Sequence, residues 1–197
     1  MNTTTWSENV IVADADYIDK VAFDLTVNFE RMIGRRIPKA DLARWIDCVA
    51  LDGGVREGEQ QTQVVLIHDK RRDSLQNFIP GNYAVELHGQ AFRDHLGEFC
   101  LSAYPVEEMV SKTDFLTDVL QTVCTQDEVK RVMVIADVDQ AGVLDSIRTV
   151  LRRADDEKRI TVFAMAPMAG GNFRQEILGY SLMAALGIRA EEVKDEN

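Results

Sequence analysis

Two short apolar runs in this chain each end in a pair of aspartates one residue apart. Residues 10–16 read VIVADAD, and residues 132–139 read VMVIADVD. An apolar β-branched run bounded by polar residues is typical of a buried parallel strand. Ligands of open α/β sheets collect beyond the carboxyl ends of such strands. The two runs therefore predict a parallel sheet with several carboxylates along one edge.

Clustered carboxylates repel one another, so such a site calls for a hard cation such as Mg²⁺ or Mn²⁺. Divalent ions held by carboxylates can also activate a water molecule for hydrolysis. The candidate acids are Asp14, Asp16, Asp114, Asp118, Asp137 and Asp139. Asp114 and Asp118 are four residues apart in a predicted helix and so share a face. Alternatively, Asp16 and Asp139 are N-caps of the helices that follow them, and the helical pair is solvated.

Strands and helices alternate along the chain with no domain break, which predicts one domain over residues 1–197. Helical spacing of apolar residues predicts helices at 19–32, 38–53, 113–124, 141–153 and 175–186. Apolar runs predict strands at 10–14, 63–68, 98–103, 130–137 and 160–165, and an alternating segment predicts a half-buried or edge strand at 83–88. The acidic residues from about 189 to 197 are expected to be a frayed tail. This alternation implies an α/β fold, Rossmann-like in outline, with a mainly parallel sheet and helices on both faces.

The composition is that of an ordinary globular chain, with 46% hydrophobic and 28% charged residues among 197. No apolar run approaches the roughly 20 residues that span a bilayer, which predicts no membrane association. The N-terminal residues lack the features of a signal peptide. Cys48, Cys100 and Cys124 are far apart and form no CxxC pair, which disfavours a disulfide framework or a zinc site. A cytoplasmic protein is expected.

The net charge is −11, whereas proteins held on nucleic acid by general electrostatics are usually basic. Any contact with nucleic acid must therefore come from a local patch of positive charge. The run Lys70, Arg71 and Arg72, directly after a predicted strand, is the candidate for binding a substrate.

The order of these features resembles the NYN domains of the PIN-like nuclease superfamily. The resemblance is carried by the strand ending in Asp14, by Lys112-Thr113-Asp114 before a helix, and by the strand that runs into Asp137-Val138-Asp139. It covers about residues 9–166. The implied fold is a compact three-layer α/β/α sandwich.

The same resemblance implies an activity, the hydrolysis of RNA with Mg²⁺ or Mn²⁺. The implied metal-binding and catalytic acids are Asp14, Asp114, Asp137 and Asp139. Asp16 and Asp118, the other two acids of the set, are candidates for a supporting role. The expected substrate is single-stranded RNA, bound weakly because of the acidic charge and mainly through Lys70, Arg71 and Arg72.

Two other interpretations stay open. Residues 136–142, ADVDQAG, are similar to the Asp-x-Asp segment of Toprim domains, which would imply a different nucleic-acid enzyme. The chain could also be a catalytically inactive α/β module that binds a partner or a second copy of itself. The predicted last helix favours that interpretation, because it is apolar over much of its circumference, as in a homodimer interface.

Overall fold

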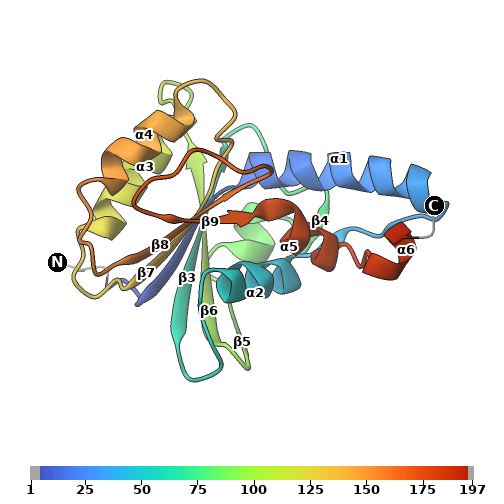
Figure 1. Ribbon diagram of the computed structural model, residues 1–197, viewed down its shortest axis with the longest axis horizontal. Coiled ribbons are helices and arrows are strands. Elements are labelled where there is room, and N and C mark those ends of the chain that lie inside the picture. Colours follow the sequence, from blue (N-terminus) through green and yellow to red (C-terminus); the bar gives the residue numbers. More distant parts are fainter. Residues whose placement is uncertain (1–4, 195–197) are drawn as a thin grey trace.

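The computed structural model of the protein describes residues 5–194, and a seven-stranded sheet runs through their centre (Figure 1). Its strand order is β5-β6-β3-β1-β7-β8-β9. The strands are β1 (Asn9–Asp14), β3 (Gln61–Asp69), β5 (Ala91–Asp94), β6 (Gly97–Val106), β7 (Arg131–Ile135), β8 (Arg159–Ala164) and β9 (Arg174–Ile177). Each neighbouring pair is parallel except β5 with β6. The predicted mainly parallel sheet is confirmed.

Helices cover both faces of this sheet. One face carries α1 (Ala15–Ile33), α2 (Leu42–Asp52) and α5 (Leu178–Ala185), and the other carries α3 (Lys112–Cys124) and α4 (Val143–Leu151) (Figure 1). Successive residues of a strand point to opposite faces, so Ile11 packs in the first layer while Val10 and Val12 pack in the second. The architecture is a three-layer α/β/α sandwich, as expected. Within residues 5–194, no helix is long and apolar enough to cross a membrane.

The path of the chain through the sheet places the ends of β1 and β7 side by side. The chain moves from β1 outward to β3 and β6, then returns past β1 to β7 and continues to β8. β1 and β7 pair directly, with Ala13 opposite Ile135. This confirms that the strand ending in Asp14 lies beside the one that leads to Asp137. The reversal of strand order between them is the kind of switch point at which doubly wound folds bind ligands.

The segment predicted as an edge strand at 83–88 is instead a single π-helical turn, η1 (Tyr83–Leu87). The Asn82 side chain accepts a hydrogen bond from the Val85 N–H and starts the turn. Tyr83 and Leu87 are both buried. Four-residue spacing of buried groups suits a helical turn, and the antiparallel edge strand is β5, which follows it.

The predicted helix at 175–186 is also partly wrong. Residues Arg174–Ile177 form β9, whose backbone pairs with the exposed edge of β8, and the helix begins only at Leu178. The spacing of apolar residues within 175–186 does not indicate that an unpaired edge of β8 lies nearby, so it could not predict this strand. The second helix likewise begins at Leu42 rather than at Pro38, because the Asp41 side chain caps it through the Arg44 N–H. The two residues before Leu42 form β2 (Ala40–Asp41), which pairs with β4 (Phe78–Ile79).

The predicted frayed tail is helical over part of its length. Residues Ala190–Lys194 form α6, while 195–197 lie outside the described residues. Glu192 of α6 forms an ion pair with Arg35, with 2.8 Å between Oε1 and Nε. The hydrogen bond from Arg35, the backbone N–H of Arg189 and their positive charges lower the pKa of Glu192 to about 2. This contact ties the end of the described chain to the loop after α1.

A carboxyl pair links α2 to β5. Burial, together with the hydrogen bond and negative charge of Asp94, raises the pKa of Asp47 to about 7. Oδ1 of Asp47 is buried and has no hydrogen-bond partner among the described residues. A proton between this oxygen and the Asp94 carboxylate would supply the missing hydrogen bond. The Leu96 N–H already donates to Asp94 at 2.8 Å, and such a bond is stronger to a carboxylate than to a carboxylic acid. The proton of the pair therefore belongs on Asp47.

This pair predicts an unusual dependence of stability on pH. In the unfolded chain, Asp47 loses its proton near its ordinary pKa of 3.8. In the folded protein, Asp47 keeps this proton until about pH 7. The folded state thus binds the extra proton in this window, and its free energy of unfolding falls as the pH rises from about 4 to about 7. Asp47→Asn mimics the protonated form, so we expect it to raise the melting temperature at pH 8 and to change it little at pH 4. Asp118→Asn, at an exposed position, is the control, and an equal effect of Asp47→Asn at both pH values would contradict the shared proton.

Candidate active site

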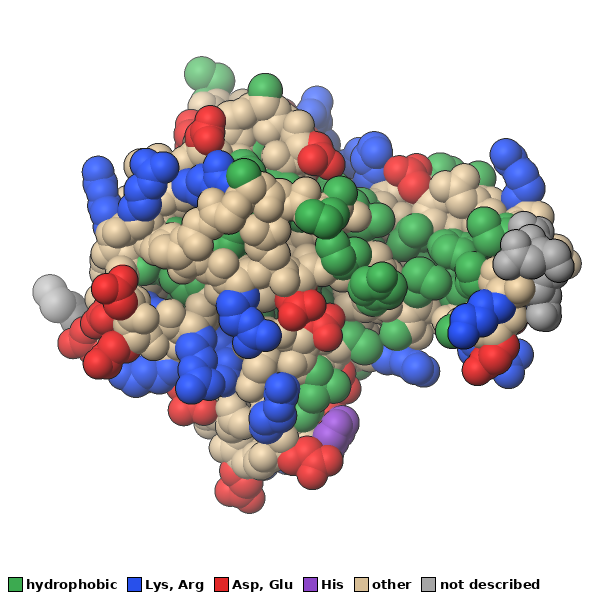
Figure 2. Space-filling view, viewed as in Figure 1, with side chains coloured by type: hydrophobic (Ala, Val, Ile, Leu, Met, Phe, Trp, Pro, Cys, Tyr) green, Lys and Arg blue, Asp and Glu red, His purple; other side chains and the backbone are tan. Residues whose placement is uncertain are grey.

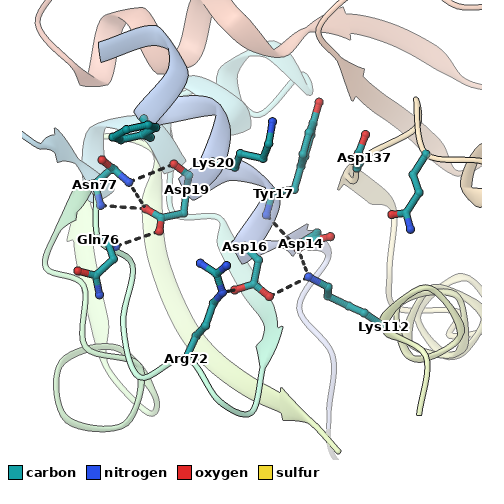
Figure 3. A pocket seen from close by; sticks show the side chains of 12 residues that line it. Asp14, Asp16, Tyr17, Asp19, Lys20, Arg72, Gln76, Asn77, Lys112 and Asp137 are labelled. Atoms are coloured by element: carbon teal, nitrogen blue, oxygen red, sulfur yellow. Dashed lines mark hydrogen bonds and ion pairs between the residues drawn. The ribbon is translucent and has the colours of Figure 1, made fainter. Parts of the chain in front are cut away.

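A cavity of about 390 Å³ opens at the carboxyl ends of β1 and β7 (Figure 3). Its walls come from the start of α1, the loop after β3, the start of α3 and the turn after β7. The residues that line it are Asp14, Asp16, Tyr17, Asp19, Lys20, Phe23, Arg72, Gln76, Asn77, Lys112, Asp137 and Gln140. Three of the predicted acids, Asp14, Asp16 and Asp137, therefore meet in one cavity.

Asp14 and Asp16 are positioned by the junction of β1 and α1. Asp14 is the N-cap of α1 and accepts a hydrogen bond from the Tyr17 N–H at 3.1 Å. Asp16 accepts one from the Asp69 N–H at 2.8 Å, which turns its carboxylate toward the end of β3. The interpretation of Asp16 as the helix cap is therefore wrong, because Asp14 has that role. Burial raises the pKa of Asp14, although Lys112 opposes the shift.

Lys112, the first residue of α3, bridges these two carboxylates (Figure 3). Its Nζ lies 3.2 Å from Oδ1 of Asp14 and 2.8 Å from Oδ2 of Asp16. Burial alone would lower the pKa of the ammonium, but the two carboxylates outweigh burial and the pKa is raised. Lys112 therefore stays charged and neutralises part of the cluster. It was not among the predicted site residues, although the Lys-x-Asp motif before the helix was a signal for it.

Asp137 faces the same cavity from the turn after β7 (Figure 3). Among residues 5–194, no cation forms an ion pair with its carboxylate and no group donates a hydrogen bond to it. Burial and the negative charges of Asp137, Asp139 and Asp14 raise the pKa of Tyr17 to about 12. The Tyr17 hydroxyl thus stays protonated at neutral pH and can donate a hydrogen bond.

The remaining predicted acids lie outside the lining of this cavity. Asp114 is exposed in the first turn of α3, and Asp139 is exposed in the turn after β7. Asp118 lines a different, mainly apolar cavity beside Trp6 and Phe115. Asp139 is not a helix cap either, since α4 begins after Gly142 with no side-chain cap. In the described part of the chain, no three His, Cys, Asp or Glu side chains are already arranged to hold a metal ion.

The predicted substrate-binding cations are each near a carboxylate. Lys70 pairs with Glu107 at 2.7 Å, and Arg71 pairs with Asp69 at 2.9 Å. Arg72 is held more loosely, with Nε 3.8 Å from Oδ1 of Asp16, too far for a hydrogen bond. Of the three cations, Arg72 is the one that lines the acidic cavity.

Sequence reasoning missed the wall of the cavity that Asp19 supports. Asp19 is buried and accepts hydrogen bonds from the backbone N–H groups of Gln76 and Asn77, at 3.0 and 2.8 Å. The Asn77 side chain also donates to it at 3.1 Å. A single aspartate one turn into a helix is no signal for such a contact. Asp19 thereby fixes the loop after β3 against α1.

The fold and the cavity together define a doubly wound α/β protein with a lysine-bridged acidic site at its switch point. The chain belongs to the DUF6621 family, a family of unknown function whose model matches residues 3–193. No curated protein and no solved structure matches it.

Proposed function

We propose that the protein is a metal-dependent ribonuclease of the NYN/PIN-like type. The observation that carries the proposal is that Asp14 and Asp137, from the ends of neighbouring strands, face one cavity at the switch point of the sheet. Carboxylates in this position are typical ligands of Mg²⁺ or Mn²⁺. The resemblance to NYN domains, which rests on the same residues, supports the same conclusion.

The oxygen donors suit a hard divalent cation in their chemistry, although in the described residues they are not yet arranged around a common point. The Asp137 carboxylate has no cationic partner among the described residues, and Oδ1 of Asp16 is buried without a hydrogen bond. Asp14, Asp16 and Asp137 would hold the ion, and the Lys112 ammonium would withdraw from the two carboxylates that it bridges. Asp114 and Asp139, the other acids implied by the resemblance, lie outside the cavity lining and contribute at most through their charge.

A bound ion would lower the pKa of a water molecule and stabilise the charge that develops on a phosphate. The chain's own residues would do the rest. Lys112 and Arg72 would contact the phosphate oxygens, as cations do in other phosphoryl-transfer sites. The Tyr17 hydroxyl, protonated because its pKa is about 12, would donate a hydrogen bond to the same group.

Single-stranded RNA is the proposed substrate, in a cytoplasmic setting. The net charge of −11 and the ion pairs of Lys70 and Arg71 favour weak binding that depends strongly on salt. The three cysteines are free thiols, which suits a reducing compartment.

One observation favours a second function, that of an inactive binding module. Lys112 already pairs with both Asp14 and Asp16, so part of their negative charge is neutralised without a metal ion. The partner in that case could be a second copy of the chain. On α5, Leu178 and Leu182 are buried whereas Tyr180 is 71% exposed, which leaves an aromatic ring for an interface.

Metal binding separates these two functions. We expect millimolar Mn²⁺ to raise the melting temperature by about 3–5 °C if its concentration is about ten times the Kd, because the ion binds only the native state. Asp137→Asn should abolish the shift with little loss of stability. Asp118→Asn, an exposed aspartate on α3, should retain it. An unchanged melting temperature of the wild type in Mn²⁺ would favour the binding module.

A further inference from the structure

A second cavity, of about 700 Å³, lies next to the acidic cavity and shares Arg72 with it. We propose that this second cavity binds the base of a nucleotide whose phosphate lies at Arg72. The identity of that nucleotide as part of an RNA rests on the proposed ribonuclease function. The volume is within the range of about 300–1,000 Å³ that small-molecule sites occupy.

The walls of the second cavity are aromatic. The rings of His68 and Tyr83 stack with centroids 3.7 Å apart and an interplanar angle of 8°. Both residues are buried, so this wall is rigid. Tyr104 is 40% exposed, and its ring meets that of His88 edge-to-face with centroids 5.9 Å apart. Exposed aromatic rings of this kind are the surfaces on which single-stranded nucleic acids stack their bases.

The two histidines have different protonated nitrogens. The Ala103 N–H donates to Nδ1 of His88 at 3.0 Å, so Nδ1 is the acceptor and the proton of the neutral ring is on Nε2. Nδ1 of His68 lies 2.9 Å from the Asp69 carbonyl, which can only accept, so His68 carries its proton on Nδ1. Nε2 of His88 is therefore a donor and Nε2 of His68 an acceptor. Both histidines line the second cavity, and the edge of a base carries donors and acceptors of both kinds.

Positive charge lies where a phosphate would follow the base. Arg72 lines both cavities, its side chain is 58% exposed, and it makes only the long 3.8 Å contact with Asp16. Lys70 also lines the second cavity, although its ammonium pairs with Glu107 at 2.7 Å. An aromatic cavity with a loosely held guanidinium at its border suits a planar ring joined to a phosphate. A base held here would direct its own phosphate toward Asp14 and Asp137.

The test compares AMP with ribose phosphate, which lacks the base, by calorimetric titration of the wild-type protein. Because stacking supplies the difference, we expect AMP to bind about tenfold more tightly than ribose phosphate. Tyr104→Ser should remove this preference, whereas Tyr104→Phe, which keeps the ring, should preserve it. Tyr180→Ser, which removes an exposed tyrosine on α5, is the matched control and should bind AMP like the wild type. Arg72→Gln should weaken both ligands alike.

Equal affinity for the two ligands, or a preference for AMP that survives Tyr104→Ser, would overturn the proposal. The outcome is independent of catalysis, because Asp14→Asn/Asp137→Asn should bind AMP at least as well as the wild type. Binding of AMP through Tyr104 without RNA cleavage would support this site and count against the ribonuclease. RNA cleavage without binding of AMP would do the reverse.

Discussion

Asp14→Asn/Asp137→Asn is expected to lower Mn²⁺-dependent cleavage of single-stranded RNA by more than about 100-fold. Loss of a metal's supporting partners alone costs about 10–100-fold, and loss of the ligands should cost more. The fold should survive, because asparagine caps helices about as well as aspartate, and its side-chain oxygen in place of that of Asp14 would still accept from the Tyr17 N–H. The measurement is the rate of cleavage of labelled RNA by matched preparations.

The control for this variant should remove the same charge elsewhere. Asp24→Asn/Asp118→Asn also neutralises two carboxylates, both at exposed positions outside the cavity. We expect it to cleave RNA at least as fast as the wild type, because a less negative surface repels RNA less. Cleavage that persists in Asp14→Asn/Asp137→Asn would show that the activity belongs to another site or to a contaminant.

Asp19→Ala should destabilise the protein by about 3 kcal/mol, since hydrogen bonds to a charged acceptor contribute about 1.5–3 kcal/mol each. The substitution leaves the Gln76 and Asn77 N–H groups without the acceptor that they have in the native protein. A loss of this size would lower the melting temperature by about 6–12 °C in a domain of this length. Thermal and urea denaturation would measure it.

Asp24→Ala on the same helix is the matched control for this loss. Asp24 pairs with Lys20 at 3.2 Å, but both side chains are more than half exposed, and such pairs contribute about 0.3–0.5 kcal/mol. Asp19→Asn keeps one acceptor oxygen and should recover part of the stability. If Asp19→Ala were no more destabilising than Asp24→Ala, the proposed role of Asp19 in supporting the cavity wall would be wrong.

Figure 2 shows one face of the molecule on which hydrophobic side chains gather in the half that contains α1 and α5. Phe23 of α1 and Tyr180 of α5 are 53% and 71% exposed. The apolar spacing predicts a helix at 19–32 but not how deeply each turn is buried, and the buried residues of α1 end at Ala22. The second half of α1 is covered less completely, because Leu25, Phe29 and Ile33 pack against the core but are only partly buried.

Local sequence was sufficient to predict the central strands and most of the helices that follow them. The strands β1, β3, β7 and β8 are buried on both faces of the sheet. Such strands are apolar along nearly their whole length, whatever packs against them, so they can be recognised from sequence. Asp14 is at the end of β1 because an aspartate both ends an apolar run and caps a helix. These local properties were enough to predict that Asp14 and Asp137 would be neighbours.

The surroundings of those acids depend on contacts between distant parts of the chain. Lys112 reaches Asp16 across 96 positions, and Asp19 holds Asn77 across 58. The strand β9 depends on the free edge of β8, and Asp114 lies outside the cavity lining although Lys112, two residues earlier, is part of it. These contacts depend on where the sheet places each segment in space. The local sequence pattern of a segment does not specify its place in the sheet. The predicted acids were therefore only partly the ones that the fold gathered.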